Sequence, residues 1–87
     1  MRLKKGYRPV RLGNEYVLIA YGREEKSLGG AVRLNEVSAF ILGMLKDDKT
    51  MEEVTDAMVK RYEISEETAS ADLTEMINEF KEMGVIE

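Results

Sequence analysis

The stretch AVRLNEVSAFILGML, residues 31–45, contains the change of hydrophobic period that decides the fold. Its first four residues alternate, which places the side chains of Val32 and Leu34 on one face of a strand and that of Arg33 on the other. Asn35, a good N-cap residue, follows. Beyond it the apolar residues recur at helical spacing: Val37, Phe40, Ile41, Met44 and Leu45. The stretch therefore predicts a short strand, residues 31–34, that passes directly into a helix.

Upstream of this stretch the sequence predicts a hairpin. Pro9, the only proline, opens an extended segment, and the β-rich run EYVLIAY, residues 15–21, follows Gly13-Asn14. A two-residue Gly-Asn loop suits the positive φ values of tight hairpin turns. Residues 22–30 are polar at the centre and bounded by glycine, which predicts an exposed loop before the third strand.

Downstream, two more helices are predicted. Thr50 and Glu53 have the S/T-x-x-E spacing of a capping box, so a helix begins there and runs to about residue 62. Ser65 caps a third helix, which ends at Gly84. The expected buried residues of these two helices are Val54, Ala57, Met58 and Tyr62, then Ala69, Leu73, Met76, Ile77 and Phe80.

Three short strands followed by three helices predict a winged-helix-like α+β domain with a three-stranded antiparallel sheet. With 87 residues the chain is expected to form one domain, residues 1–87, because a second hydrophobic core could not be built from what remains.

The composition argues against catalysis. The chain has no histidine and no cysteine, so the common general bases, thiol nucleophiles and transition-metal ligands are missing. Ser38 and Ser65 have no base partner and are interpreted as a helix-surface hydroxyl and a helix cap. We therefore expect no enzymatic activity, no metal and no cofactor.

The absence of cysteine also fits a reducing compartment, so the cytoplasm is the expected location. The longest apolar run, residues 16–21, is far shorter than the roughly 20 residues that span a bilayer. The N-terminus lacks the apolar stretch of a signal peptide. We expect no membrane association.

The charge is divided unevenly along the chain. Residues 1–33 carry eight basic and three acidic side chains, a net charge of +5, whereas residues 34–87 carry five basic and fourteen acidic ones, a net charge of −9. A winged-helix-like shape makes nucleic-acid binding or transcriptional regulation the alternative function, with the third helix in the major groove. That helix, however, contains one basic residue, Lys81, and six acidic ones, which would face a polyanion. The sequence therefore does not favour nucleic acid as the partner.

Several of these segments resemble the PqqD family, named for the small protein of pyrroloquinoline quinone biosynthesis. The similar segments are AVRLNE at 31–36 leading into AFIL at 39–42, TMEEV at 50–54, Tyr62, and FKEMGVI at 80–86. The resemblance covers nearly the whole chain, and the Leu34-Asn35 pair is its most distinctive part. The chain differs from the family in its longer charged loop at residues 22–30.

The resemblance implies a RiPP recognition element, a domain that binds the leader of a ribosomally synthesised and post-translationally modified precursor peptide. In that mode the leader adds as an antiparallel strand beside the third strand and lies against the third helix. The partner enzyme of such domains is frequently a radical SAM protein. A short edge strand with free N–H and C=O groups suits this binding mode, and it also permits self-association into a homo-oligomer.

Transfer of the family site to this chain gives eight expected peptide-binding residues: Ala31, Val32, Arg33 and Leu34 on the strand, and Asp72, Met76, Glu79 and Met83 on one flank of the third helix. The opposite flank of that helix, with Ser70, Thr74 and Lys81, remains an alternative. Val32 and Leu34 are also expected to pack in the core, whether or not their backbones bind peptide.

Overall fold

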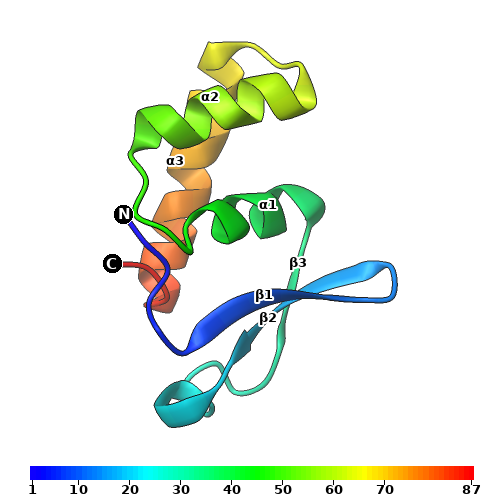
Figure 1. The fold of residues 1–87 in the computed structure, drawn as a ribbon, viewed down its shortest axis with the longest axis vertical. Coiled ribbons are helices and arrows are strands. Elements are labelled where there is room, and N and C mark those ends of the chain that lie inside the picture. Colours follow the sequence, from blue (N-terminus) through cyan, green and yellow to red (C-terminus); the bar gives the residue numbers. More distant parts are fainter.

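The computed structural model describes residues 1–87. Its elements are, in order, β1 (Tyr7–Leu12), β2 (Glu15–Ala20), the 3-10 helix η1 (Gly22–Glu24), β3 (Val32–Leu34), α1 (Glu36–Met44), α2 (Met51–Tyr62) and α3 (Glu66–Met83). The strands form an antiparallel sheet in the order β1-β2-β3. All three helices lie on one side of the sheet, with α1 next to it (Figure 1). The predicted α+β fold is confirmed, and the loop at residues 22–30 contains one short helical turn that was not expected.

The hairpin forms as the sequence predicts. β1 and β2 pair from Tyr7 with Ala20 to Leu12 with Glu15, so Gly13 and Asn14 alone make the loop. Of the two loop residues, only Gly13 has a positive φ, 64°. A loop with a positive φ at its first residue alone matches the type II′ turn, which requires glycine there.

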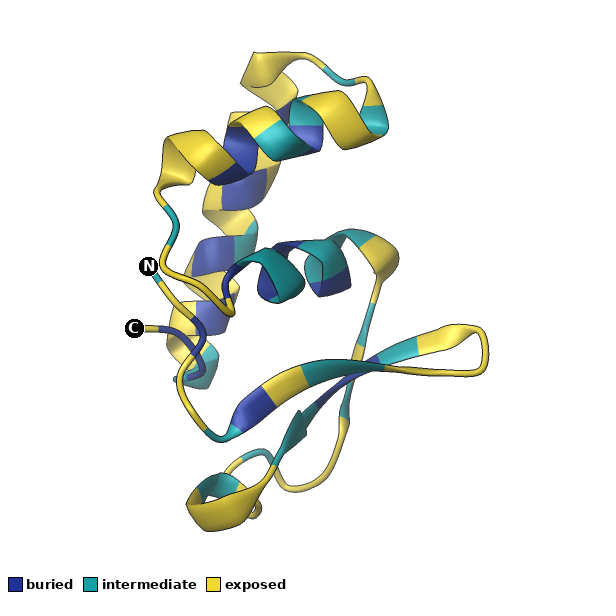
Figure 2. Ribbon diagram, viewed as in Figure 1, coloured by how far each residue is buried: buried dark blue, intermediate teal, exposed yellow.

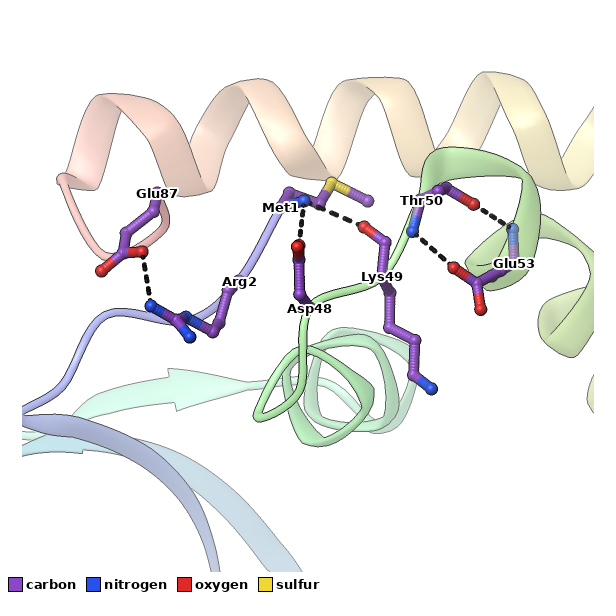
Figure 3. A network of polar contacts seen from close by, with 7 residues as sticks. All are labelled: Met1, Arg2, Asp48, Lys49, Thr50, Glu53 and Glu87. Atoms are coloured by element: carbon purple, nitrogen blue, oxygen red, sulfur yellow. Dashed lines mark hydrogen bonds and ion pairs between the residues drawn. The ribbon is translucent and has the colours of Figure 1, made fainter.

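The predicted helix ends are also present. The side chain of Asn35 accepts a hydrogen bond from the N–H of Ser38, the third residue of α1, and that of Ser65 accepts one from the N–H of Thr68, the third residue of α3. Thr50 and Glu53 form the reciprocal capping box, with both hydrogen bonds 3.0 Å long (Figure 3). The N–H of Thr50 donates to the Glu53 carboxylate and thereby lowers the pKa of Glu53. Gly84 ends α3 in the left-handed conformation, with φ 75°.

The core lies where the helices meet each other and the sheet. Figure 2 shows the buried residues of the helices facing inward and their exposed residues facing outward. Ile41 and Leu42 in α1 and Leu45, which directly follows it, are fully buried. Val37, Phe40 and Met44, which were expected on the same buried stripe, are half-buried. The buried residues of α1 differ from the predicted ones because one side of this helix contacts the sheet and another side contacts the other two helices. Its buried surface therefore also includes Leu42.

The two chain ends lie side by side, which local sequence patterns did not predict. Leu3 forms an antiparallel bridge with Ile86, and both side chains are buried. The N–H of Leu3 donates to the carbonyl of Leu45 over 2.7 Å, and that of Lys4 donates to the carbonyl of Val85 over 2.8 Å. These bonds fix residues 2–4 against the C-terminal ends of α1 and α3.

Polar contacts surround this junction (Figure 3). The guanidinium of Arg2 pairs with the carboxylate of Glu87 at 3.1 Å, and the amino group of Met1 pairs with Asp48 at 2.9 Å. The hydrogen bond from that ammonium lowers the pKa of Asp48. None of the helices is both long enough and apolar enough to cross a membrane.

Candidate functional site

β3 is one of the two edge strands of the sheet. It pairs with β2 on one side only, with Leu34 opposite Tyr16, Arg33 opposite Val17 and Val32 opposite Leu18. The other side of β3 has no partner strand. This is the edge that strand addition requires.

The direction of the backbone groups along β3 follows from the sheet register. In an antiparallel pair, residues that exchange hydrogen bonds alternate with residues whose N–H and C=O groups point away from the partner strand. The N–H of Tyr21 donates to the carbonyl of Gly6 over 2.8 Å, so the odd-numbered residues of β2 bond to β1 and its even-numbered residues face β3. Val32 and Leu34, opposite even-numbered residues, therefore direct their backbone groups toward β2. Arg33, opposite Val17, directs its N–H and C=O away from the sheet.

The other edge of the sheet is less suited to strand addition. By the same alternation, the residues of β1 that face away from β2 are Tyr7, Pro9 and Arg11. Pro9 has no N–H, so the middle position of this outward-facing row lacks a donor. On β3, by contrast, the outward-facing residue Arg33 keeps both its N–H and its C=O.

The side chains of β3 follow the predicted alternation. Val32 and Leu34 are half-buried and pack against the core, and Arg33 is exposed. The guanidinium of Arg33 pairs with the carboxylate of Glu15 at 3.0 Å on the outer face of the sheet. Ala31 is exposed and precedes the strand, so the predicted strand began one residue too early.

A cavity of about 220 Å³ separates α3 from the N-terminal end of α1. Six residues line it: Asn35, Ser38, Asp72, Glu75, Met76 and Glu79. Asn35 directly follows β3, so the cavity opens beside the end of the free strand edge. Three of the expected helix residues, Asp72, Met76 and Glu79, are thus brought together there.

The hydroxyl of Ser38 lies 3.9 Å from the sulfur of Met76 and joins the two walls of this cavity. Ser38 is half-buried, so the interpretation of its hydroxyl as a helix-surface group was incomplete. Ser38, Glu75 and Asn35 were not among the expected site residues, because which part of α1 faces α3 depends on packing between the helices. The Glu75 carboxylate adds to those of Asp72 and Glu79, so the cavity favours a cationic group.

Met83 does not line the cavity. It is half-buried and packs against the core. It lies on the same flank of α3 as Met76, but seven residues later, which is about 10 Å along the helix axis at 1.5 Å per residue. The opposite flank of α3 is exposed and lines none of the cavities; there the Thr74 hydroxyl bonds to the carbonyl of Ser70 over 2.8 Å.

An open strand edge beside an acidic helix flank, on a winged-helix-like domain, defines a small module suited to strand addition. The family model described as coenzyme PQQ synthesis protein D (PqqD) matches residues 15–86. The chain therefore belongs to the PqqD family. No curated protein sequence matches the chain.

Two solved structures share the fold. The structure of TbiB1 in complex with the TbiA(beta) leader peptide superposes with a TM-score of 0.80 at 22% sequence identity, covering 100% of this chain and 95% of TbiB1. The structure of lasso peptide synthetase B1 complexed with the leader peptide has a TM-score of 0.72 at 24% identity, covering 97% of this chain and 93% of the synthetase chain. Both relatives were solved with a leader peptide bound.

Proposed function

We propose that this domain binds the leader peptide of a ribosomally synthesised precursor by strand addition at β3 and presents it to a separate modifying enzyme. The observation that carries the proposal is the backbone of Arg33, which directs an N–H and a C=O to the free edge of the sheet. Membership of the PqqD family and the leader peptides bound to two structural relatives support the same function.

The bound peptide extends past the end of β3 toward the cavity between α1 and α3. There Asp72, Glu75 and Glu79 receive a basic side chain of the leader, and Met76 contacts an apolar one. The outward-facing backbone of β3, at Arg33, supplies affinity, and the cavity supplies the choice of sequence.

In this proposal the domain contributes no catalytic group. Its role is to hold the precursor close to the active site of a modifying enzyme, which raises the effective concentration of the segment to be modified. A radical SAM enzyme is the proposed partner, from the resemblance of the chain to its family. Nucleic acid is disfavoured, because the helix that would enter the groove presents carboxylates at its open flank.

Amide hydrogen exchange of the full chain tests strand addition directly. The probe is a synthetic leader peptide from a short precursor gene adjacent to the gene for this domain. Without peptide, the N–H of Arg33 exchanges fast, and those of Val32 and Leu34, which bond to β2, exchange slowly. Addition of peptide should protect Arg33 and leave Tyr7 and Arg11, which face outward on β1, unchanged. Binding without protection of Arg33 would show that the peptide uses another surface.

A further inference from the structure

The largest cavity of the molecule lies away from β3 and has the opposite charge. Its volume is about 470 Å³, and it lies between residues 3–5, the start of β1, Tyr21 and the C-terminal end of α1. Four of its nine lining residues are basic, namely Lys4, Lys5, Arg8 and Lys46, and none is acidic. We infer that this basic cavity is a second binding site, which takes a carboxylate-rich segment of a partner protein.

None of these four cations has a carboxylate partner within the fold. Arg2, Arg33 and Arg61 each pair with a carboxylate, but none of the cations of the basic cavity forms an ion pair. Glu24, in the adjoining hollow, accepts a hydrogen bond from the Tyr7 hydroxyl. The positive charge of the cavity is therefore available to a ligand.

Two of the cations, Lys4 and Arg8, are attached to backbone that is hydrogen-bonded within the fold. Lys4 lies in the segment whose N–H groups bond to the C-terminal ends of α1 and α3, next to the buried Leu3. Arg8 belongs to β1, and its guanidinium lies 5.8 Å from the centre of the Tyr21 ring. The guanidinium of Arg8 is thus already positioned for a ligand, which reduces the entropy lost on binding.

The glycine at position 43 supports the proposed binding site independently of the charges. It lies within α1, where glycine destabilises a helix relative to alanine, and its φ is not positive. A Cβ placed on Gly43 would meet no atom within 4 Å, so packing does not require glycine here either. Gly43 lines the basic cavity, and the absence of a side chain keeps the wall of the cavity open.

Charge complementarity favours a protein carboxylate as the ligand. A duplex nucleic acid would extend beyond four clustered cations and meet a chain whose net charge is −4 and whose α3 is acidic. The cavity belongs to the β1 side of the sheet, whereas the leader is proposed to add at β3, with β2 between them. Both sites can therefore be occupied together, so a partner bound at the basic cavity would leave the leader site free.

Nuclear magnetic resonance titration of the full-length chain with an end-blocked hexaglutamate peptide tests this site. The amide signals of Lys4, Lys5, Tyr21 and Gly43 should shift. Arg8→Glu should weaken binding by about tenfold or more, because it replaces an attraction with a repulsion. Lys26→Glu reverses an exposed charge outside the cavity and should change affinity by less than about twofold, as exposed, screened charges do.

Gly43→Leu should block the cavity and weaken hexaglutamate binding; if the leucine variant does not fold, Arg8→Glu alone decides. Three outcomes would overturn the inference. The shifts could map elsewhere or persist in Arg8→Glu. Inorganic phosphate or a short DNA duplex could bind as tightly as hexaglutamate. Sedimentation could show self-association that Arg8→Glu abolishes, which would assign the cavity to a second copy of the chain.

Discussion

Arg33 lies opposite Val17 at the centre of the β2–β3 register, and it is the residue of β3 whose backbone groups point away from the sheet. Its side chain is exposed and its backbone lies at the free edge, so the two can be altered separately. The neighbouring Val32 and Leu34 combine a core side chain with a backbone bonded to β2.

Arg33→Pro is therefore expected to weaken leader binding by roughly tenfold or more, since it removes one hydrogen bond and places the proline ring against the peptide. Arg33→Ala should change affinity by less than about threefold, because it removes only an exposed ion pair. Isothermal calorimetry measures both, and circular dichroism checks the fold. Val32→Pro is the matched control, because it removes an N–H that bonds to β2 and should destabilise the domain itself. Parent-like binding by a folded Arg33→Pro variant would contradict strand addition at β3.

The carboxylates of the α3 flank are expected to select a basic leader residue. Asp72→Lys and Glu79→Lys should each weaken binding by about two- to fivefold at low salt, because exposed charge pairs contribute up to about 1 kcal/mol. The difference from the parent should shrink as salt is added, since the Debye length is only about 10 Å at 0.1 M. Ser70→Lys places a lysine on the opposite, exposed flank. It changes the charge by one unit where Asp72→Lys changes it by two, and its effect should be less than half as large. If Ser70→Lys weakens binding more than Asp72→Lys does, the leader lies on that flank instead.

The Thr50–Glu53 capping box is expected to stabilise the domain in a pH-dependent way. The pKa of Glu53 is lowered in the folded state because the N–H of Thr50 donates to its carboxylate. The stability that this bond provides is present above the unfolded-state pKa of about 4.3 and is lost as the pH falls through the folded-state value. Urea unfolding should show Glu53→Gln less stable than the parent at pH 7, with a smaller difference near pH 3.

Two further variants isolate the cap. Thr50→Ala should cost about 1 kcal/mol at pH 7, the usual effect of removing an N-cap side chain. Glu52→Gln removes a carboxylate from the same helical turn, but Glu52 makes no side-chain hydrogen bond, and its effect should be smaller. If the stabilities of the Glu52 and Glu53 variants depend equally on pH, the stabilisation comes from negative charge near the helix N-terminus and not from the capping box.

Gly43→Ala is expected to stabilise the domain by about 0.5–1 kcal/mol, because alanine replaces glycine within a helix and its Cβ meets no neighbouring atom. Thermal or urea unfolding measures this directly. Gly6→Ala is the contrasting case, since Gly6 has φ 97° and an added Cβ would lie 2.7 Å from the side chain of Glu24. That variant should be destabilised.

The elements that could be predicted from the sequence depend on neighbouring residues. Helix caps and tight turns involve residues only a few positions apart, so local sequence patterns predict them. This applies to the caps at Asn35, Thr50 and Ser65 and to the Gly13-Asn14 turn. The contact between Leu3 and Ile86 joins segments more than 80 residues apart, and no local pattern encodes it.

The same distinction applies to the candidate site. Alternation predicted which side chains of β3 face the core, and helical spacing predicted that Asp72, Met76 and Glu79 share a flank. A helical wheel does not include distance along the axis, so it also included Met83, which lies beyond the cavity. The contributions of Asn35 and Ser38 depend on how α1 packs against α3, which the pattern of either helix alone does not contain.

The proline on the outward-facing side of β1 has a consequence for assembly. A sheet with two competent edges can pair with a copy of itself at each end, and such copies can continue to add into a filament. With Pro9 interrupting one edge, a copy can pair fully only through β3, and two copies joined there leave only proline-interrupted edges outside. Edge-to-edge association would then stop at a dimer. The free edge of β3 can therefore stay exposed at high protein concentration without causing the chains to assemble into a filament.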